Sequence, residues 1–497
     1  MTVSAEALPA SAGHRIWLSV MPISPRYQPD PQHQRLGAEF ADPVEAARFP
    51  ATILRYRNDR AAASVGLDAL SDSEWLAHFG RFEPLPENLR EPLALRYHGH
   101  QFRVYNPEIG DGRGFLFAQL REAGAGRLLD LGTKGSGQTP HSRFGDGRLT
   151  LKGGVREVLA TAMLEALGVP TSRSFSLIET GEELVRNDEP SPTRSSVLVR
   201  LSHSHVRFGT FQRLAYFDKR EEIGRLIDYV VEHYYPGLHN APAKPVALLK
   251  AVLDRSANLV GRWMAAGFVH GVLNTDNMNL TGESFDYGPY RFLPRNDPNF
   301  TAAYFDETGL YAFGRQPEAV FWNVRQLAGA LTLVSETEPL VEAINTFSAG
   351  YRAALTNAML RRLGLAPHGG EDDIDLVNAA FRALAEGGDD LRWEPFFFDW
   401  FGGRASEARA LAGPRRDRYE GAAFLEFRHR LGDYAMDRPE RLDAAYFART
   451  EPEELLYDEI EAIWAAIAGS DDWLPFQSKL ARIEAARQAW ALDGDAA

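Results

Sequence analysis

The chain has 497 residues, with 68 acidic side chains against 54 Lys and Arg, a formal net charge of −14 and no cysteine. The net charge argues against a general nucleic-acid binder, because neutralising phosphates needs a basic surface, whereas a local nucleotide pocket is compatible with an acidic protein. The absence of cysteine excludes disulfides, thiolate nucleophiles, thiolate-bound zinc and iron–sulfur clusters.

The N-terminal sequence has no basic start followed by an apolar run, and no later window reaches the roughly 18 apolar residues of a membrane span. We therefore expect a cytoplasmic protein that spans no membrane and binds no nucleic acid. A chain of this length exceeds what a single hydrophobic core usually serves, so two or more packed lobes are expected.

The first predicted element is a helix over 73–79. It lies within residues 1–85, which we interpret as an N-terminal extension that packs on the lobes. Two short apolar runs follow, over 115–122 and 127–134, and the sequence AGAG between them suits a turn. This pattern predicts a β-hairpin.

A helix is predicted over 155–167, because apolar residues recur there at helical spacing and glycines flank the run. Two more strand-like runs cover 174–181 and 195–202. The resulting order of strand, strand, helix, strand and strand resembles the small lobe of a protein kinase. We therefore assign residues 86–210 to a kinase-like N-lobe that carries nucleotide-binding loops.

From about Phe211 onward the pattern is mainly helical, with long amphipathic runs over 215–235 and 245–267. We assign residues 211–497 to a helical C-lobe. The predicted fold class is thus α+β, a protein-kinase-like two-lobed fold with a small β-rich N-lobe and a large, mainly helical C-lobe.

A glycine-rich stretch precedes the first strand of the hairpin. Gly110 and Gly112 would let backbone N–H groups approach phosphates, and Arg113 could supply a fork of donors. Such a stretch is more often a tight turn, and it matches neither a Walker loop nor the full dinucleotide-binding pattern.

A second glycine-rich loop, 135–154, joins the hairpin to the predicted helix and contains Asp146 and Gly147. A phosphate-bearing ligand would satisfy the backbone groups of a loop of this kind. Arg200 and Arg207 would add two guanidiniums that a bound anion could neutralise, although solvated arginines are commoner.

Lys134 ends the second strand and Glu157 falls in the first turn of the predicted helix. In this layout the carboxylate could hold the ammonium against phosphate oxygens, as kinases do. The alternative is a surface lysine and a glutamate favoured by the helix dipole.

The segment 269–290 is the most informative part of the sequence. It follows a long helical run and brings Asp276, Asn277 and Asp286 within eleven positions. Two carboxylates and a carboxamide are hard oxygen ligands suited to magnesium, and a carboxylate can accept a hydroxyl proton. The alternative is a simple turn followed by a loop acid.

Together these motifs resemble the selenoprotein O family of kinase-like protein adenylyltransferases. The resemblance covers about residues 96–292 and rests on long, ordered motifs: YHGHQF, GDGRG, GTKGSGQTP, RFGDGRLTLKGGVRE, SHVRFGTF and HGVLNTDNMNL with FDYGPY.

The resemblance implies that ATP binds flipped relative to ordinary kinases, so that AMP moves to Ser, Thr or Tyr hydroxyls of other proteins and pyrophosphate leaves. UMP transfer from UTP with manganese is implied as a further activity. Asp276 would be the catalytic base, with Lys134 oriented by Glu157, and Asn277 and Asp286 would bind Mg²⁺ or Mn²⁺. The implied nucleotide contacts are Gly110, Gly112, Arg113, Lys134, Asp146, Gly147, Arg200, Arg207 and Asp286.

This sequence departs from the family in lacking cysteine, because many relatives carry a cysteine or selenocysteine near the C-terminus or a regulatory disulfide. Two other functions are compatible with the same residues. One is transfer of the γ-phosphoryl group, with the nucleotide bound the other way round; the other is a nucleotide-binding pseudokinase that acts as a scaffold.

Overall fold

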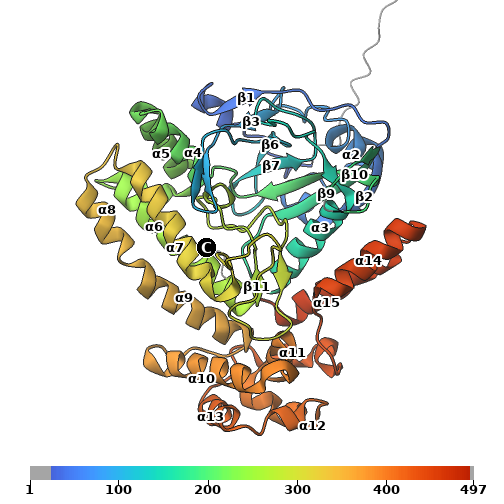
Figure 1. Cartoon of the computed structure of the whole chain (residues 1–497), viewed down its shortest axis with the longest axis vertical. Coiled ribbons are helices and arrows are strands. Elements are labelled where there is room, and N and C mark those ends of the chain that lie inside the picture. The colour runs from blue at the N-terminus through green and yellow to red at the C-terminus, as the bar shows by residue number, and fades with distance from the viewer. Residues whose placement is uncertain (1–23, 188, 493–497) are drawn as a thin grey trace, which may run out of the picture.

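The computed structural model describes residues 24–187 and 189–492. An antiparallel sheet dominates the N-terminal half, and the C-terminal half is mostly helical (Figure 1). The predicted α+β class is confirmed. The first 23 residues of the predicted N-terminal extension lie outside the described residues. No helix in the described ranges has the length and apolar character needed to cross a bilayer.

The main sheet has antiparallel neighbours throughout, and strands β1 and β2 from the segment 1–85 lie at its two ends. The predicted hairpin is present, with Leu120 opposite Leu129. In spatial order the strands are β1 (Ala41–Pro43), β3 (Leu93–Leu95), β6 (Leu116–Arg121), β7 (Leu128–Lys134), β10 (Thr193–Ser202), β9 (Arg173–Leu184) and β2 (Ile53–Arg57), and β8 (Leu149–Thr150) pairs with β10.

Both faces of this sheet are covered. Helices α1 (Asp59–Ser64) and α2 (Asp72–Phe79) share a buried cluster with Val197 and Val199 of β10. Leu198, between these two valines, belongs instead to the cluster that contains α3. Successive side chains of a strand point to opposite faces, so β10 is apolar on both sides and lies inside the sheet.

Helix α3 (Leu151–Ala166) begins four positions earlier than the predicted residue 155. Thr150 caps the helix, because its Oγ1 accepts a hydrogen bond from the Gly153 N–H at 3.1 Å. The paired glycines lie inside the first turn for a packing reason: a Cβ at Gly154 would lie 2.4 Å from Cδ1 of Leu177 on β9. They allow the helix to approach the sheet closely and do not mark its start.

The helical half surrounds an irregular segment, 268–315, that contains the short strands β11 (Phe268–Val269) and β12 (Arg291–Phe292). A separate two-stranded hairpin is formed by β4 (Gly99–Gln101) and β5 (Val104–Asn106). The helices are α4 (Phe208–Tyr216), α5 (Arg220–Tyr234), α6 (Lys244–Ala265), α7 (Gln316–Leu331), α8 (Thr337–Ile344), α9 (Phe347–Arg362), α10 (Glu371–Gly387), α11 (Trp393–Asp399), α12 (Glu407–Ala412), α13 (Ala422–Leu431), α14 (Tyr457–Ser470) and α15 (Leu474–Trp490).

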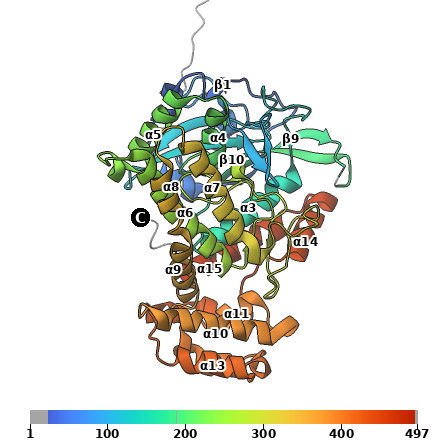
Figure 2. The same cartoon turned by 60° about the vertical axis from the view of Figure 1, so that its left-hand side comes forward.

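Helices α10 to α13 form a block at the end of the molecule away from the sheet (Figure 2), and they share a buried cluster with parts of α9. The last two helices return toward the sheet, where α15 packs on α3. Lys152 at the start of α3 pairs with Glu461 of α14 at 2.7 Å. The C-terminal helices therefore support the helix that carries Glu157.

Candidate functional site

A polar cavity of about 620 Å³ is lined by residues from both halves of the chain. The predicted residues Glu157 and Asn277 are not among its lining. Glu157 lies behind Lys134, and Asn277 adjoins the lining residue Asp276. The other predicted residues all line the cavity: Gly110, Gly112, Arg113, Lys134, Asp146, Gly147, Arg200, Arg207, Asp276 and Asp286.

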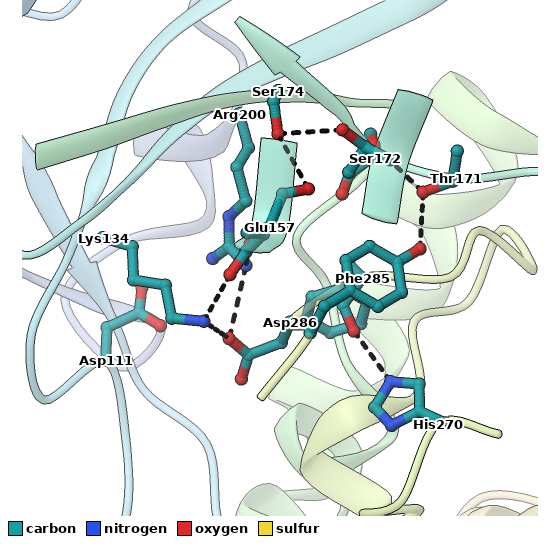
Figure 3. A network of polar contacts seen from close by, with 12 residues as sticks. Asp111, Lys134, Glu157, Thr171, Ser172, Ser174, Arg200, His270, Phe285 and Asp286 are labelled. Atoms are coloured by element: carbon teal, nitrogen blue, oxygen red, sulfur yellow. Dashed lines mark hydrogen bonds and ion pairs between the residues drawn. The ribbon is translucent and has the colours of Figure 1, made fainter. Parts of the chain in front are cut away.

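A network of two cations and two carboxylates lies at the inner end of the cavity (Figure 3). Lys134 Nζ lies 2.6 Å from Oε2 of Glu157 and 2.6 Å from Oδ1 of Asp286. Arg200 Nη1 lies 3.3 Å from the other Glu157 oxygen and 3.5 Å from Asp286 Oδ1. The sequence places Lys134 at the end of β7 and Glu157 in the second turn of α3, and the packing of α3 on the sheet brings them together.

Asp286 has a left-handed backbone conformation, with φ of 64°. Non-glycine residues rarely adopt this conformation, and it is maintained here by buried neighbours on both sides of the residue, Phe285 and Tyr287. Burial would raise the pKa of the Asp286 carboxyl, but the charges of Lys134 and Arg200 hold it well below its usual range. The group is therefore an ionised hard ligand at neutral pH.

Asp276 lies in a 3-10 turn, Thr275–Asn277, that is tied to the β4–β5 hairpin. The Thr275 hydroxyl accepts a hydrogen bond from the His100 N–H at 2.7 Å. Burial raises the pKa of the Asp276 carboxyl to about 6, although the charge of Arg207 opposes this shift. The Asp276 carboxylate lines the cavity, with its Oδ1 buried against Gly99 of β4, and a carboxylate in this position can accept a proton from a ligand.

Arg207 connects Asp276 with Asp111, two residues that line the cavity. Its Nη1 donates to the Asp276 carbonyl at 2.8 Å, and its Nη2 lies 3.3 Å from Oδ1 of Asp111. The guanidinium stacks between two rings, 4.4 Å from the centre of Tyr97 and 4.8 Å from that of Phe285. Within the described part of the chain, the buried Nε of Arg207 is without a hydrogen-bond partner, and the same is true of Arg200 Nε.

The second glycine-rich loop forms the outer side of the cavity. Its ends meet where the Gly137 N–H donates to the Gly147 carbonyl at 3.1 Å. Asp146 is half exposed and its carboxylate pairs with Arg186 at 2.8 Å. This pair and the exposed Arg113 place three charged side chains at the cavity mouth.

Sequence reasoning did not select Asp111, Tyr97, Phe285 or Arg186. Asp111 and Tyr97 belong to the quoted motifs GDGRG and YHGHQF. Their places in these motifs could have marked them as candidate site residues. Phe285 opens the FDYGPY motif quoted above, but its contact with Arg207, 78 positions away in the chain, is not revealed by any local pattern.

The residues present fit a divalent cation that is shared with phosphates. No group of three or more His, Cys, Asp or Glu side chains that could hold a metal occurs in the described ranges. Magnesium in phosphate-transferring sites is usually bound by only one or two carboxylates plus water and phosphate oxygens. Asp286 offers such a carboxylate, and the Asn277 amide nitrogen donates to the Val272 carbonyl at 3.0 Å, which leaves the amide oxygen available to a cation.

Comparisons with known proteins agree with this chemistry. Residues 25–484 match the family model described as Protein adenylyltransferase SelO. The chain is 45% identical over 483 residues to the protein nucleotidyltransferase YdiU of Synechocystis sp., a match that covers 92% of this chain and 97% of the relative. Proteins of the same name from Synechococcus elongatus and Gloeobacter violaceus are 43% and 45% identical, over 94% and 91% of this chain and 96% and 94% of their own lengths.

Proposed function

This chain belongs to the SelO family of protein adenylyltransferases and is a protein nucleotidyltransferase, and we propose that it transfers AMP from ATP to hydroxyl groups of other proteins in the cavity described above. One observation carries the assignment of the site. The carboxylate of Asp276 lines the same cavity as Lys134, Arg200 and Arg207. Such a cavity combines an acceptor for a proton with cations for a polyphosphate.

The arrangement is that of a kinase-like fold, with an N-lobe over 86–210 and a C-lobe over 211–497. Support comes from the order of the parts: a lysine at the end of a strand, a glutamate on the next helix, and an acidic segment after a long helix. Lys134 holds phosphate oxygens, and Glu157 keeps its ammonium in place through the 2.6 Å contact. Arg113, Arg200 and Arg207 bind the remaining phosphate charge, with Gly110, Gly112 and the 146–147 turn against the nucleotide.

Mg²⁺ or Mn²⁺ bound by Asp286 and Asn277 supplies further neutralisation of phosphate charge. Ionised Asp286 fits this role, because the positive groups around it keep its pKa low. Asp286 also pairs with Lys134 and Arg200 and so balances the charge of these two cations.

The reaction forms a bond between the acceptor oxygen and the α-phosphorus and breaks the bond from that phosphorus to the β-phosphate bridging oxygen. Pyrophosphate is the leaving group, and the acceptor proton passes to the Asp276 carboxylate. Because burial raises the pKa of Asp276 to about 6, the group is mostly ionised at neutral pH and still basic enough to accept the proton.

The deciding experiment incubates the purified chain with Mg²⁺, a cell lysate and ATP labelled at either the α- or the γ-phosphate. Label in protein from the α-position alone is the expected result. Label from the γ-position alone would show a kinase and overturn the proposal. A parallel reaction with α-labelled UTP and Mn²⁺ tests whether UMP is also transferred. The Asp286→Ala variant, which should be inactive, is the negative control. Asp254→Ala, on the exposed face of α6, is its matched control and should keep full activity.

A further inference from the structure

The β4–β5 hairpin forms the side of the cavity next to Asp276. A Cβ at Gly99 would lie 2.9 Å from Asp276 Oδ1, so only glycine lets this strand lie so close to the carboxylate. Gln101, on the same face of the strand, also lines the cavity. Gln101 stands opposite Val104 in the hairpin register. Residues opposite each other share a face, so Val104 lies on the cavity side.

The turn of this hairpin is strained. Phe102 and Arg103 connect the two strands, and both have positive φ, 50° and 63°. Two-residue turns of this type normally contain Asn and Gly, because bulky side chains disfavour such backbone angles. Outside contacts maintain the turn: the Phe102 N–H donates to Asn274 Oδ1 at 3.0 Å, and Arg103 pairs with Glu318 at 2.9 Å. Strain that is maintained in this way is typical of functional positions.

The strained turn is bordered by exposed apolar side chains: Val104 follows it in the hairpin, and the ring of Phe102 packs on that of Phe305. The Phe102 ring lies 5.9 Å from that of Phe305, which lies 5.1 Å from that of Tyr304. Three apolar side chains here are exposed: Val104 at 70%, Tyr304 at 82% and Phe305 at 46%. We call these three residues the hairpin rim. Exposed apolar side chains that gather at the edge of a site usually contact a partner.

We propose that the hairpin rim is the docking surface for the acceptor protein, where it binds an apolar stretch of that protein next to the modified hydroxyl. This inference rests on the proposed function. The physical reason is access. The acceptor hydroxyl must reach Asp276. Strand β4 approaches this carboxylate at Gly99, and Val104 lies on the same face of the hairpin, on the neighbouring strand β5.

The charges around the rim favour an apolar partner over an anionic one. Arg103 is the cation of the turn, and it is already paired with Glu318 and lies 5.6 Å from the centre of the Trp322 ring. The guanidinium groups that suit phosphates, on Arg113, Arg200 and Arg207, line the cavity itself. The nucleotide therefore has its own binding groups, and the rim adds only apolar contact area, which suits a polypeptide segment.

The test compares the full-length chain with a Val104→Ser, Tyr304→Ser double variant, because these two side chains are the most exposed of the rim and their loss should leave the fold intact. The matched control is Leu425→Ser, Leu474→Ser, with side chains 52% and 66% exposed on α13 and α15. Incorporation of label from α-labelled ATP is measured against increasing lysate protein, and ATP affinity is measured separately with a fluorescent ATP analogue.

For the rim variant, the initial slope of label incorporation against lysate protein should fall at least about tenfold, as expected for the loss of interface anchors. Its ATP affinity should equal that of the wild type. The control variant should match the wild type in both measurements. Incorporation equal to that of the control would overturn the inference. A parallel loss of ATP affinity would also overturn it, because the rim would then serve the nucleotide or the fold. Failure of the proposed function itself looks different, because the wild-type chain would then incorporate no α-label.

Discussion

The two sides of the cavity are built on different principles. The proposed nucleotide side consists of Lys134, Arg200 and Arg207, each held by buried carboxylates or aromatic rings. The proposed acceptor side is the β4–β5 hairpin with an exposed apolar rim. Charges fixed before the substrate arrives need no reorganisation during transfer, whereas an exposed apolar surface can accept more than one sequence. The contrast suggests an enzyme that is strict about its nucleotide and more tolerant of its acceptor.

Asp286→Ala should give the largest effect on the nucleotide side. It removes the proposed metal carboxylate and leaves Lys134 and Arg200 without one of their two partners. We expect transfer of label from α-labelled ATP to fall on the order of 10³-fold, with the Asp254→Ala control unchanged. Wild-type turnover in this variant would show that Asp286 does not belong to the active site.

Glu157→Gln tests whether the nucleotide side depends on the orientation of Lys134. Glutamine keeps the shape of this fully buried side chain but loses the charge that holds the ammonium at 2.6 Å. Supporting groups of this kind typically contribute 10- to 100-fold to activity, so kcat should fall by about that factor. The melting temperature is recorded alongside, and a loss of activity that only follows unfolding would contradict the positioning role.

Replacing the strained turn tests the acceptor side without touching the nucleotide side. In Phe102→Asn, Arg103→Gly the turn receives residues that favour its positive φ angles, but the ring contact with Phe305 is lost. We expect a lower melting temperature, because Phe102 loses its contact with Tyr311 and Arg103 its ion pair with Glu318, together with unchanged ATP affinity and a several-fold loss of protein labelling in the folded variant. Full labelling in this variant would show that Phe102 has no part in presenting the rim.

Substitution of Glu283 should have the smallest effect on the site. This residue lies in the segment between Asp276 and Asp286, the two proposed site carboxylates. Burial raises the pKa of its carboxyl to about 7, against the His203 N–H that donates to it at 2.7 Å and the charges of Arg173 and Arg127. Between about pH 4.5 and 7 the folded state therefore binds more protons than the unfolded state, and stability falls as pH rises.

Glu283→Gln removes this titration. It should stabilise the chain by about 1–3 kcal/mol at pH 8 and by much less at pH 5, measured as unfolding free energy in urea. At high pH the buried wild-type carboxyl is ionised at a cost in stability, and the substitution removes this cost. An equal effect at both pH values would show that Glu283 is ionised throughout in the folded protein.

Local sequence patterns were sufficient for much of this description. The β6–β7 hairpin and the helical half followed from the spacing of apolar residues, and the candidate residues followed from motif chemistry and family resemblance. Periodicity failed at the start of α3, because Gly153 and Gly154 look like a helix boundary but lie inside the first turn, where Gly154 packs closely against β9. A pattern along one chain segment does not contain the identity of its packing partner.

The sequence by itself determined which groups are available: an ammonium after a strand, a glutamate on the following helix, and two carboxylates in one irregular segment. Only the tertiary structure decided that Asp286 lies 2.6 Å from Lys134, that Arg207 stacks between Tyr97 and Phe285, and that a hairpin from residues 99–106 borders Asp276. These contacts join residues about 80 to 180 positions apart. They depend on how the sheet, α3 and the irregular segment pack together, which local propensity does not specify.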